Sequence, residues 1–169
     1  PFANVAHGCS SVIATRVGLA HADFVITEAG FDFSLGGEKF LHLKCRSAGL
    51  YPDLVVLVAT VRALRHHGRG LADPLASGLD HLRRQVANVR AFGLEPLVCL
   101  NVFDADSEDE LRIVERCAHE LDVPAVRCTG FRDGGRGAEE FARAVRSVLA
   151  ERAPREPQFL YPLDASYIQ

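Results

Sequence analysis

The segment "DLVVLVATV", residues Asp53–Val61, carries the strongest strand signal in the sequence, because six of its nine residues are Val or Leu. A short, continuous apolar run of this kind is typical of a strand that is buried on both faces. Such strands occur mainly in parallel sheets that have helices on both sides. The segment therefore predicts a central strand of an α/β fold.

The segments on either side of it alternate between strand and helix patterns. Three further segments are short and apolar, as buried strands are: Asp23–Ala29, Glu95–Phe103 and Val123–Cys128. Five segments show helical spacing of apolar residues: Ser10–Leu19, Leu35–Ala48, Leu75–Phe92, Ser107–Leu121 and Gly137–Glu151. The alternation predicts a three-layer α/β/α domain with a mostly parallel, doubly wound sheet.

Several predicted helices carry recognisable end signals. Ser10 and Ser11 are N-cap candidates for the first helix. Ser107 and Glu110 have the spacing of a capping box. Gly49 follows the second helix as a C-cap. These signals predict where the helices begin and end.

Composition limits the class of protein. The chain has 169 residues and a formal net charge of -3, with its arginines spread along the sequence. We expect one domain, residues 1–152, and a segment, residues 153–169, that leads into the remainder of a longer protein. The charge pattern favours neither nucleic acid nor a membrane surface as a partner. No apolar run is long enough to span a bilayer.

The five cysteines are widely spaced and contain no C-x-x-C pair. This pattern indicates reduced thiols rather than disulfides or a zinc site. Together with the absence of a basic and apolar leader at Pro1, it predicts a soluble, cytoplasmic protein.

Candidate functional residues follow the predicted strands, since ligands of doubly wound sheets bind beyond the carboxyl ends of the strands. Glu28 could coordinate Mg²⁺, or it could accept hydrogen bonds from backbone amides at a helix N-terminus. Arg62 could neutralise a phosphate or carboxylate, or pair with Glu28. Spacing alone leaves these alternatives open.

Two further segments at this edge have a functional and a structural interpretation. Asn101 could hydrogen-bond a purine edge through its amide, or it could open an Asx turn. The "RDGGRG" segment, Arg132–Gly137, could direct backbone amides at an anion, or it could be a plain turn. His7, just ahead of the first helix, could contact an anionic intermediate or act as an acid.

Other catalytic motifs are missing from the sequence. No G-x-x-x-x-G-K-[ST] motif occurs, and no Ser/His/Asp or Cys/His arrangement stands out. His66 and His67 are adjacent, so they cannot readily share a metal from one helix face, and we expect them to be exposed.

Four blocks together resemble one family. The blocks are "PFANVAHGCSSVIAT" (1–15), "ADFVITEAGF...LGGEKFLHLKCR" (22–46), "PDLVVLVATVRALRHHG" (52–68) and "LYPLD" (160–164). In their order and spacing they are similar to formate-tetrahydrofolate ligase, also called formyltetrahydrofolate synthetase. The resemblance covers essentially the whole chain.

The resemblance implies an ATP-dependent enzyme of one-carbon metabolism. Such an enzyme activates formate as formyl phosphate and transfers the formyl group to N10 of tetrahydrofolate. It implies ATP, Mg²⁺ and tetrahydrofolate as ligands, and a sheet of the P-loop NTPase type. It also leaves room for a homo-oligomer of the full-length protein.

The resemblance also implies roles for particular residues. It makes Glu28 a Mg²⁺ or substrate contact and Asn101 a nucleotide contact, and it retains Arg62 as a catalytic candidate. Gly30, in the turn after Glu28, joins the predicted cofactor-binding residues. The first block places five residues near the reacting groups: Phe2, Ala3, Asn4, His7 and Gly8.

The chain departs from the family pattern in several places. Asp32, Phe33 and Ser34 replace a glycine, a small residue and an acid, Val102 replaces a basic residue, and Ser10 stands where Asn is common. The family's P-loop lies upstream of Pro1, so we expect the isolated chain to be inactive. Two alternatives remain: a non-catalytic or split homologue, and a related ATP-dependent carboxylate ligase.

Overall fold

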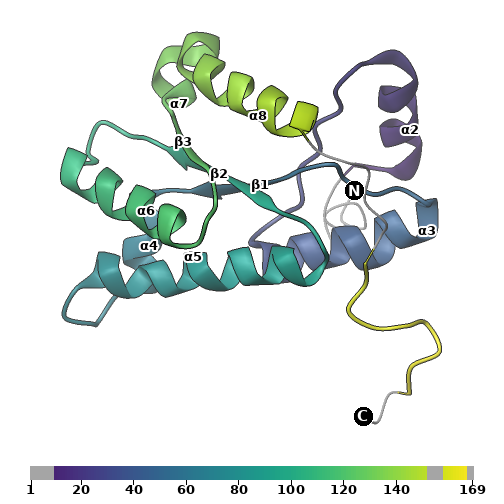
Figure 1. Ribbon diagram of the computed structural model, residues 1–169, viewed down its shortest axis with the longest axis horizontal. Coiled ribbons are helices and arrows are strands. Elements are labelled where there is room, and N and C mark those ends of the chain that lie inside the picture. The colour runs from purple at the N-terminus through teal and green to yellow at the C-terminus, as the bar shows by residue number, and fades with distance from the viewer. Residues whose placement is uncertain (1–9, 152–157, 167–169) are drawn as a thin grey trace. The chain divides into compact units, whose positions relative to one another are not determined.

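Figure 1 shows the computed structural model, which describes residues 10–151 and 158–166. The chain forms two compact units. The first is built from residues 1–52 and 157–169, and the second from residues 53–156. Each unit is considered by itself below.

The first unit begins with helix α2, Val12–His21. Its N-cap is Ser11, whose side chain accepts a hydrogen bond from the Ala14 amide at 3.1 Å. This confirms one of the two predicted caps. The hydroxyl of Thr15, one turn into the helix, accepts a hydrogen bond from the buried Lys44 ammonium at 2.8 Å. That bond joins α2 to the second helical segment of the unit.

The second helical segment, residues 33–48, confirms the predicted helix but is wider than an α-helix for most of its length. It consists of π-helices η1, Phe33–Gly37, and η2, Phe40–Cys45, followed by α3, Arg46–Ala48. Gly49 ends it in the left-handed conformation, with φ of 65°, as the sequence predicts.

The predicted strand at Asp23–Ala29 does not form. The segment has no regular secondary structure, and it makes no ladder with any residue that the structure describes. Phe24 and Ile26 are 54% and 94% exposed, so the apolar run is not sandwiched between layers. Apolar, β-branched residues favour a strand, but a strand also needs a hydrogen-bonded neighbour. The composition of the segment does not show whether such a neighbour is present.

The second unit contains a parallel sheet of three strands in the order β1, β2, β3 among the described residues. The strands are β1, Val55–Ala59, β2, Pro96–Asn101, and β3, Ala125–Cys128. Leu57 pairs with Val98, which in turn pairs with Ala125. The protein is therefore of the α/β class, with a parallel sheet flanked by helices.

The central strand of this sheet is β2, not the Asp53–Val61 segment. Pro96–Leu100 is wholly buried, whereas Val56 and Val58 of β1 are 38% and 67% exposed. β1 lies at the edge because only one of its sides is paired among the described residues. Its Val and Leu content shows strand character, but content alone does not set the order of strands in a sheet.

Helices lie on both faces of the sheet (Figure 1). On one side are α4, Val61–His67, α5, Pro74–Ala91, and α6, Glu108–Glu120. On the other side is α8, Glu139–Glu151, which packs against β3. Helix α4 was not predicted, since Val61 was assigned to the preceding strand and residues 62–67 to no element.

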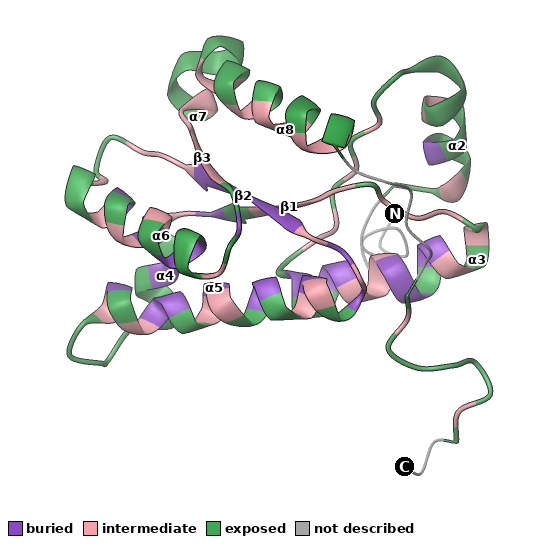
Figure 2. Ribbon diagram, viewed as in Figure 1, coloured by how far each residue is buried: buried purple, intermediate pink, exposed green. Residues whose placement is uncertain are grey.

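The core of the second unit lies between the sheet and the helices α4, α5 and α6. Leu57, Ala59, Val98 and Leu100 contribute the strand side of this cluster. Figure 2 shows the matching stripe of buried residues along α5. The helix side is formed by leucines and valines at helical spacing: Leu64, Leu75, Leu79, Leu82, Val86, Leu111 and Val114.

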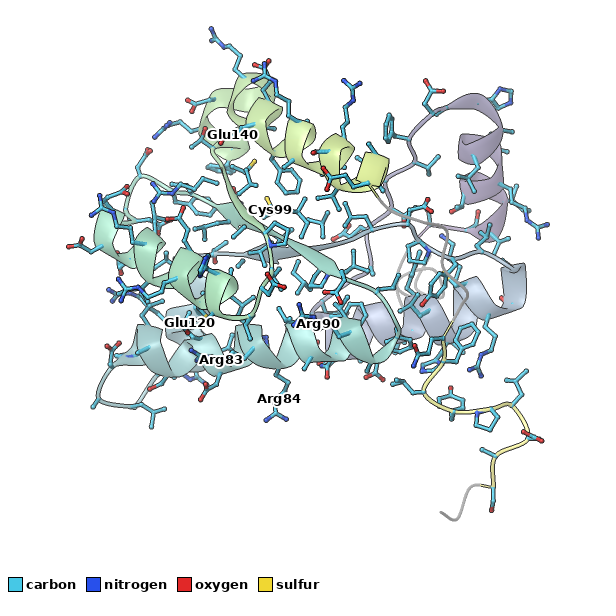
Figure 3. All side chains as sticks on the ribbon, in the orientation of Figure 1. Arg83, Arg84, Arg90, Cys99, Glu120 and Glu140 are labelled. Atoms are coloured by element: carbon cyan, nitrogen blue, oxygen red, sulfur yellow. The ribbon has the colours of Figure 1, made fainter. Side chains whose placement is uncertain are left out.

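The exposed faces of α5 and α6 carry ion pairs. Arg83 of α5 pairs with Glu120 of α6 at 3.4 Å, and these two side chains are labelled in Figure 3. Arg83 also bonds Asp80 on its own helix at 3.0 Å. Arg90, near the end of α5, pairs with Glu95 at 2.9 Å. These charges are solvent-exposed or nearly so, and they cover the outside of the apolar layer.

The described cysteines are free thiols, as the sequence predicts: Cys45, Cys99, Cys117 and Cys128. Cys99, labelled in Figure 3, is buried in β2. Its burial, together with the neighbouring Cys128 thiol, raises the pKa of Cys99 to about 12, so this thiol stays protonated at neutral pH. Among the described residues, no helix combines the length and apolar character needed to cross a bilayer.

Candidate functional site

The three strands of the second unit end at one common edge, because they are parallel. β1 ends at Ala59, β2 at Asn101 and β3 at Cys128, and Asn101 pairs directly with Cys128 in the register. This carboxyl edge is where ligands of doubly wound sheets bind. The residues around it are the candidate site of this unit.

Asn101 is half-buried at the last position of β2. The turn that follows is closed by Asp106, whose carboxylate accepts from the Phe103 amide at 2.8 Å. The Asp106 amide in turn donates to the Phe103 carbonyl at 3.0 Å. Among the residues that the structure describes, the side-chain amide of Asn101 makes no hydrogen bond. The Asn101 side chain therefore does not form the Asx turn that was the structural alternative.

Arg62 lies in the first turn of α4 with its side chain exposed. The helix begins at Thr60, whose hydroxyl accepts from the Ala63 amide at 3.0 Å. One turn further on, Arg65 forms an ion pair with Glu110 of α6. Within the described part of the chain, Arg62 has no such acidic partner, so its charge faces solvent at the start of the helix.

The segment Arg132–Gly137 is helical, so the plain turn that was its structural alternative is wrong, and the contact of its backbone amides with an anion stays a prediction. It spans the end of α7, Gly130–Asp133, and most of the 3₁₀ helix η3, Gly134–Ala138. A Cβ at Gly137 would lie 2.5 Å from Thr129 Oγ1, so glycine is needed there to let the backbone approach Thr129. Gly137 therefore serves close packing, whereas a Cβ at Gly134 or Gly135 would meet nothing within 4 Å.

The charge of Arg132 is already compensated by two nearby carboxylates. Its guanidinium donates to Asp104 at 2.9 Å and to Asp133 at 3.0 Å. The hydrogen bonds to Asp133 and Asp104 raise the pKa of Arg132, and the Arg132 guanidinium lowers the pKa of Asp133. An incoming anion would have to compete with both carboxylates.

Two phenylalanines at the carboxyl edge were not predicted as site residues. Phe103 follows β2 and Phe131 lies in α7, and their ring centroids are 5.2 Å apart at an interplanar angle of 51°. Phe131 is 79% exposed. An exposed ring beside a second ring presents a flat apolar face, so this pair is a candidate stacking surface for a flat ligand. The signal in the sequence was an aromatic residue shortly after the last residue of a strand, Phe103 after β2 and Phe131 after β3.

Glu28 and Gly30 belong to the first unit. Glu28 is exposed, so its carboxylate is not desolvated by a buried strand end. The carbonyl oxygen of Gly30 lies against Gly36 of η1, where any Cβ would be 1.5 Å away. The backbone of the turn after Glu28 is thus packed closely on the following helix.

The fit of a Mg²⁺ ion can be judged from these carboxylates. No group of three or more His, Cys, Asp or Glu side chains is arranged to hold a metal among the described residues. Mg²⁺ is usually bound through one or two carboxylates together with substrate phosphates, and an exposed carboxylate such as Glu28 fits that type of site.

The remaining predicted site residues lie outside the described residues: Phe2, Ala3, Asn4, His7 and Gly8.

Comparison with known proteins identifies the family. The family model described as formate--tetrahydrofolate ligase matches residues 1–169. The chain belongs to the formate-tetrahydrofolate ligase family. This confirms the resemblance carried by the four sequence blocks.

Curated relatives of the same name cover this chain almost completely. The formate--tetrahydrofolate ligase of Methylobacterium nodulans is 49% identical over 174 residues, which is 98% of this chain and 31% of the relative. That of Hyphomonas neptunium is 47% identical, over 100% of this chain and 32% of the relative. That of Methylobacterium radiotolerans is 52% identical, over 91% and 29% respectively. The chain spans about a third of the length of these ligases.

Proposed function

We propose that this chain forms part of the nucleotide-binding domain of an ATP-dependent formate-tetrahydrofolate ligase, which produces 10-formyltetrahydrofolate by way of formyl phosphate. The observation that carries the proposal is the family match over residues 1–169. The fold agrees with it, since a parallel sheet with its strand ends at one edge is suited to nucleotide binding. A P-loop NTPase architecture, with residues 1–152 as part of its core, belongs to this proposal.

The carboxyl edge of the second unit would contribute ligand contacts. The Asn101 amide carries both donors and acceptors in one plane, which matches the edge of a purine. Phe131 is exposed and lies against the half-buried Phe103, so the pair offers an aromatic surface. ATP and tetrahydrofolate each contain a fused heterocycle that could stack on it. The exposed Arg62 could pair with a phosphate or carboxylate of the substrates.

The first unit would contribute the acidic group. Mg²⁺, when bound with ATP, neutralises phosphate charge and supplies electrostatic stabilisation of phosphoryl transfer. Glu28 is the residue proposed to hold it or to contact the substrate. His7, Phe2, Ala3, Asn4, Gly8 and Gly30 complete the proposed set of contacts near the reacting groups. The cytoplasm is the proposed compartment.

The 169 residues contain no G-x-x-x-x-G-K-[ST] sequence, and the chain spans about a third of its relatives. We therefore propose that the complete reaction needs segments supplied by a longer protein. The departure at Asp32–Ser34 has a structural explanation, because the Asp32 carboxylate accepts from the Leu35 amide at 3.1 Å and from the Ser34 hydroxyl at 2.8 Å. Asp32 thus caps η1.

A chimera tests this function directly. Residues 1–169 would replace the matching third of the Methylobacterium nodulans ligase, and formation of 10-formyltetrahydrofolate from formate, ATP and tetrahydrofolate would be measured. We expect product, and no product from the isolated 169-residue chain. A folded chimera that binds ATP but forms no product would point to a non-catalytic homologue. A preference for acetate or another small acid over formate would point to a related carboxylate ligase.

A further inference from the structure

His42 and Arg46 lie one helical turn apart on the segment 33–48, and both contact aromatic rings of the segment 158–166. The His42 ring stacks on Tyr161, with centroids 4.4 Å apart at 23°, and lies 6.0 Å from the Phe159 ring. The Arg46 guanidinium lies 4.0 Å from the Phe159 centroid and 4.9 Å from that of Tyr161. We call these four residues the aromatic clasp.

The aromatic clasp holds together parts of the first unit that are far apart in the sequence. Arg46 Nη2 donates to the Tyr161 carbonyl oxygen at 2.7 Å, a bond between residues 115 positions apart. An open hollow of about 480 Å³ lies beside it, lined by Arg46, Phe159, Tyr161, Pro162 and Leu163. Leu163 is 83% exposed, so the segment has little buried apolar area beyond the clasp itself. The clasp therefore contributes much of the attachment of this segment, beside the bond that the Gln158 amide donates to the Tyr51 hydroxyl at 3.4 Å.

The surroundings of His42 favour its neutral form. The side chain is buried, with 8% exposed, and this burial is the main reason that its pKa lies below the ordinary value of 6.5. The nearby Arg46 charge lowers the pKa further. The Arg46 guanidinium and the Tyr161 phenol are two of the groups placed against His42. Lys44, on the same helix, is directed at Thr15 instead.

We propose that the aromatic clasp is a pH-sensitive latch, in which neutral His42 keeps the segment 158–166 on the helical segment 33–48 and protonation of His42 releases it. An imidazolium would be a second cation beside Arg46, in a buried position that both burial and like charge make unfavourable. Releasing the segment hydrates the ring and separates the charges, with a proton as the only reactant.

The sign of the pH dependence follows from the lowered pKa. When the segment is released, His42 is hydrated and titrates near 6.5; when the segment is attached, it titrates at lower pH. The released form therefore binds more protons below pH 6.5. Attachment is at full strength above pH 6.5 and weakens as the pH falls from there through the lower pKa of the attached form.

The latch can be followed by ¹⁹F NMR of the chain labelled with 3-fluorotyrosine, with the Tyr161 resonance assigned from Tyr161→Phe. Stacking on His42 gives Tyr161 a ring-current shift that a free tyrosine lacks. We expect the resonance to move to the free position as the pH falls from 8 to 5, with a midpoint below 6.5. The Cε1–H resonance of His42 should titrate with the same midpoint.

Two variants sharpen the test. His42→Phe keeps an uncharged ring against Tyr161, so its Tyr161 resonance should stay at the attached position throughout. His119→Phe removes an exposed histidine of the second unit and should retain the midpoint of the parent chain. A pH-independent Tyr161 resonance in the parent, or an unchanged midpoint in His42→Phe, would overturn the latch. If His42→Phe does not fold, a His42 titration at or above pH 6.5 in the parent overturns it.

Discussion

Gly36 and Gly30 touch through their backbones, and a Cβ at residue 36 would lie 1.5 Å from the Gly30 carbonyl oxygen. The contact packs the turn that carries the candidate ligand Glu28 against the π-helix η1. Only glycine at position 36 permits it, because the neighbouring atoms are backbone and cannot rotate away.

Gly36→Ala is accordingly expected to destabilise the first unit by about 3 kcal/mol or more, the upper range for overpacking a close contact. Thermal unfolding followed by circular dichroism measures the effect. Gly30→Ala is the matched control, since a Cβ at Gly30 meets nothing within 4 Å. It should change stability by less than about 1 kcal/mol. Equal losses in the two variants would contradict the importance of this backbone contact.

Asp32→Ala should destabilise the start of η1 by roughly 1 kcal/mol, because it removes the carboxylate that accepts from the Leu35 amide. Asp32→Asn keeps an accepting oxygen and should recover most of the loss. Urea unfolding of the three proteins gives the comparison. Full stability in Asp32→Ala would mean that the cap contributes nothing, and the departure of this position from the family pattern would then have no structural explanation.

Arg127 of β3 should make stability depend on pH through α6. It donates to Glu108 at 2.8 and 2.9 Å and to Glu115 at 2.5 and 2.9 Å. Hydrogen bonding to Arg127 is the main cause of the lowered pKa of Glu108. This stabilisation is present above the ordinary glutamate pKa of 4.5 and is lost as the pH falls through the lower folded value.

Arg127→Met should therefore lower the melting temperature at pH 7 by on the order of 3 °C, and by less at pH 3.5. Arg112→Met is the control, because Arg112 pairs only with residues of its own helix, Glu108 and Asp109, among the described residues. It should have a smaller effect at both pH values. An Arg127→Met deficit that is the same at both pH values would show that lost packing, rather than lost charge pairing, is responsible.

Phe131→Ala should weaken binding of one heterocyclic substrate by roughly ten-fold in the chimera, since stacking on an aromatic side chain contributes about 1–3 kcal/mol. The KM values for ATP and for tetrahydrofolate, measured separately, show which ring stacks there. Phe131→Tyr keeps the aromatic face and should bind nearly as the parent does. Unchanged KM values for both substrates in Phe131→Ala would remove this pair from the proposed site.

Local signals in the sequence predicted local structure well. The Ser107 and Glu110 capping box forms as expected, with the Ser107 amide donating to Glu110 at 2.9 Å. Gly49 ends its helix and Ser11 begins another. Each of these features depends on hydrogen bonds between residues three to five positions apart, which a short stretch of sequence contains in full.

Predictions that needed a distant partner were less reliable. Asp23–Ala29 has strand composition but no ladder among the described residues, and Asp53–Val61 supplies an edge strand rather than the central one. Arg132–Gly137 has loop composition, yet it is helical where Gly137 packs on Thr129. In each case the outcome depends on what lies beside the segment, and composition carries no information about that.

The sequence by itself determined the family, the alternation of strands with helices in the second unit, and the positions of several helix ends. Only the tertiary structure decided that β2 lies between β1 and β3, that the Asn101 side chain takes no part in the turn after β2, that Phe103 lies against Phe131, and that Arg46 reaches Tyr161. The physical reason is the range of the interactions. Helix propensity and capping act within one turn, whereas strand order, ring stacking and burial join residues tens to more than a hundred positions apart.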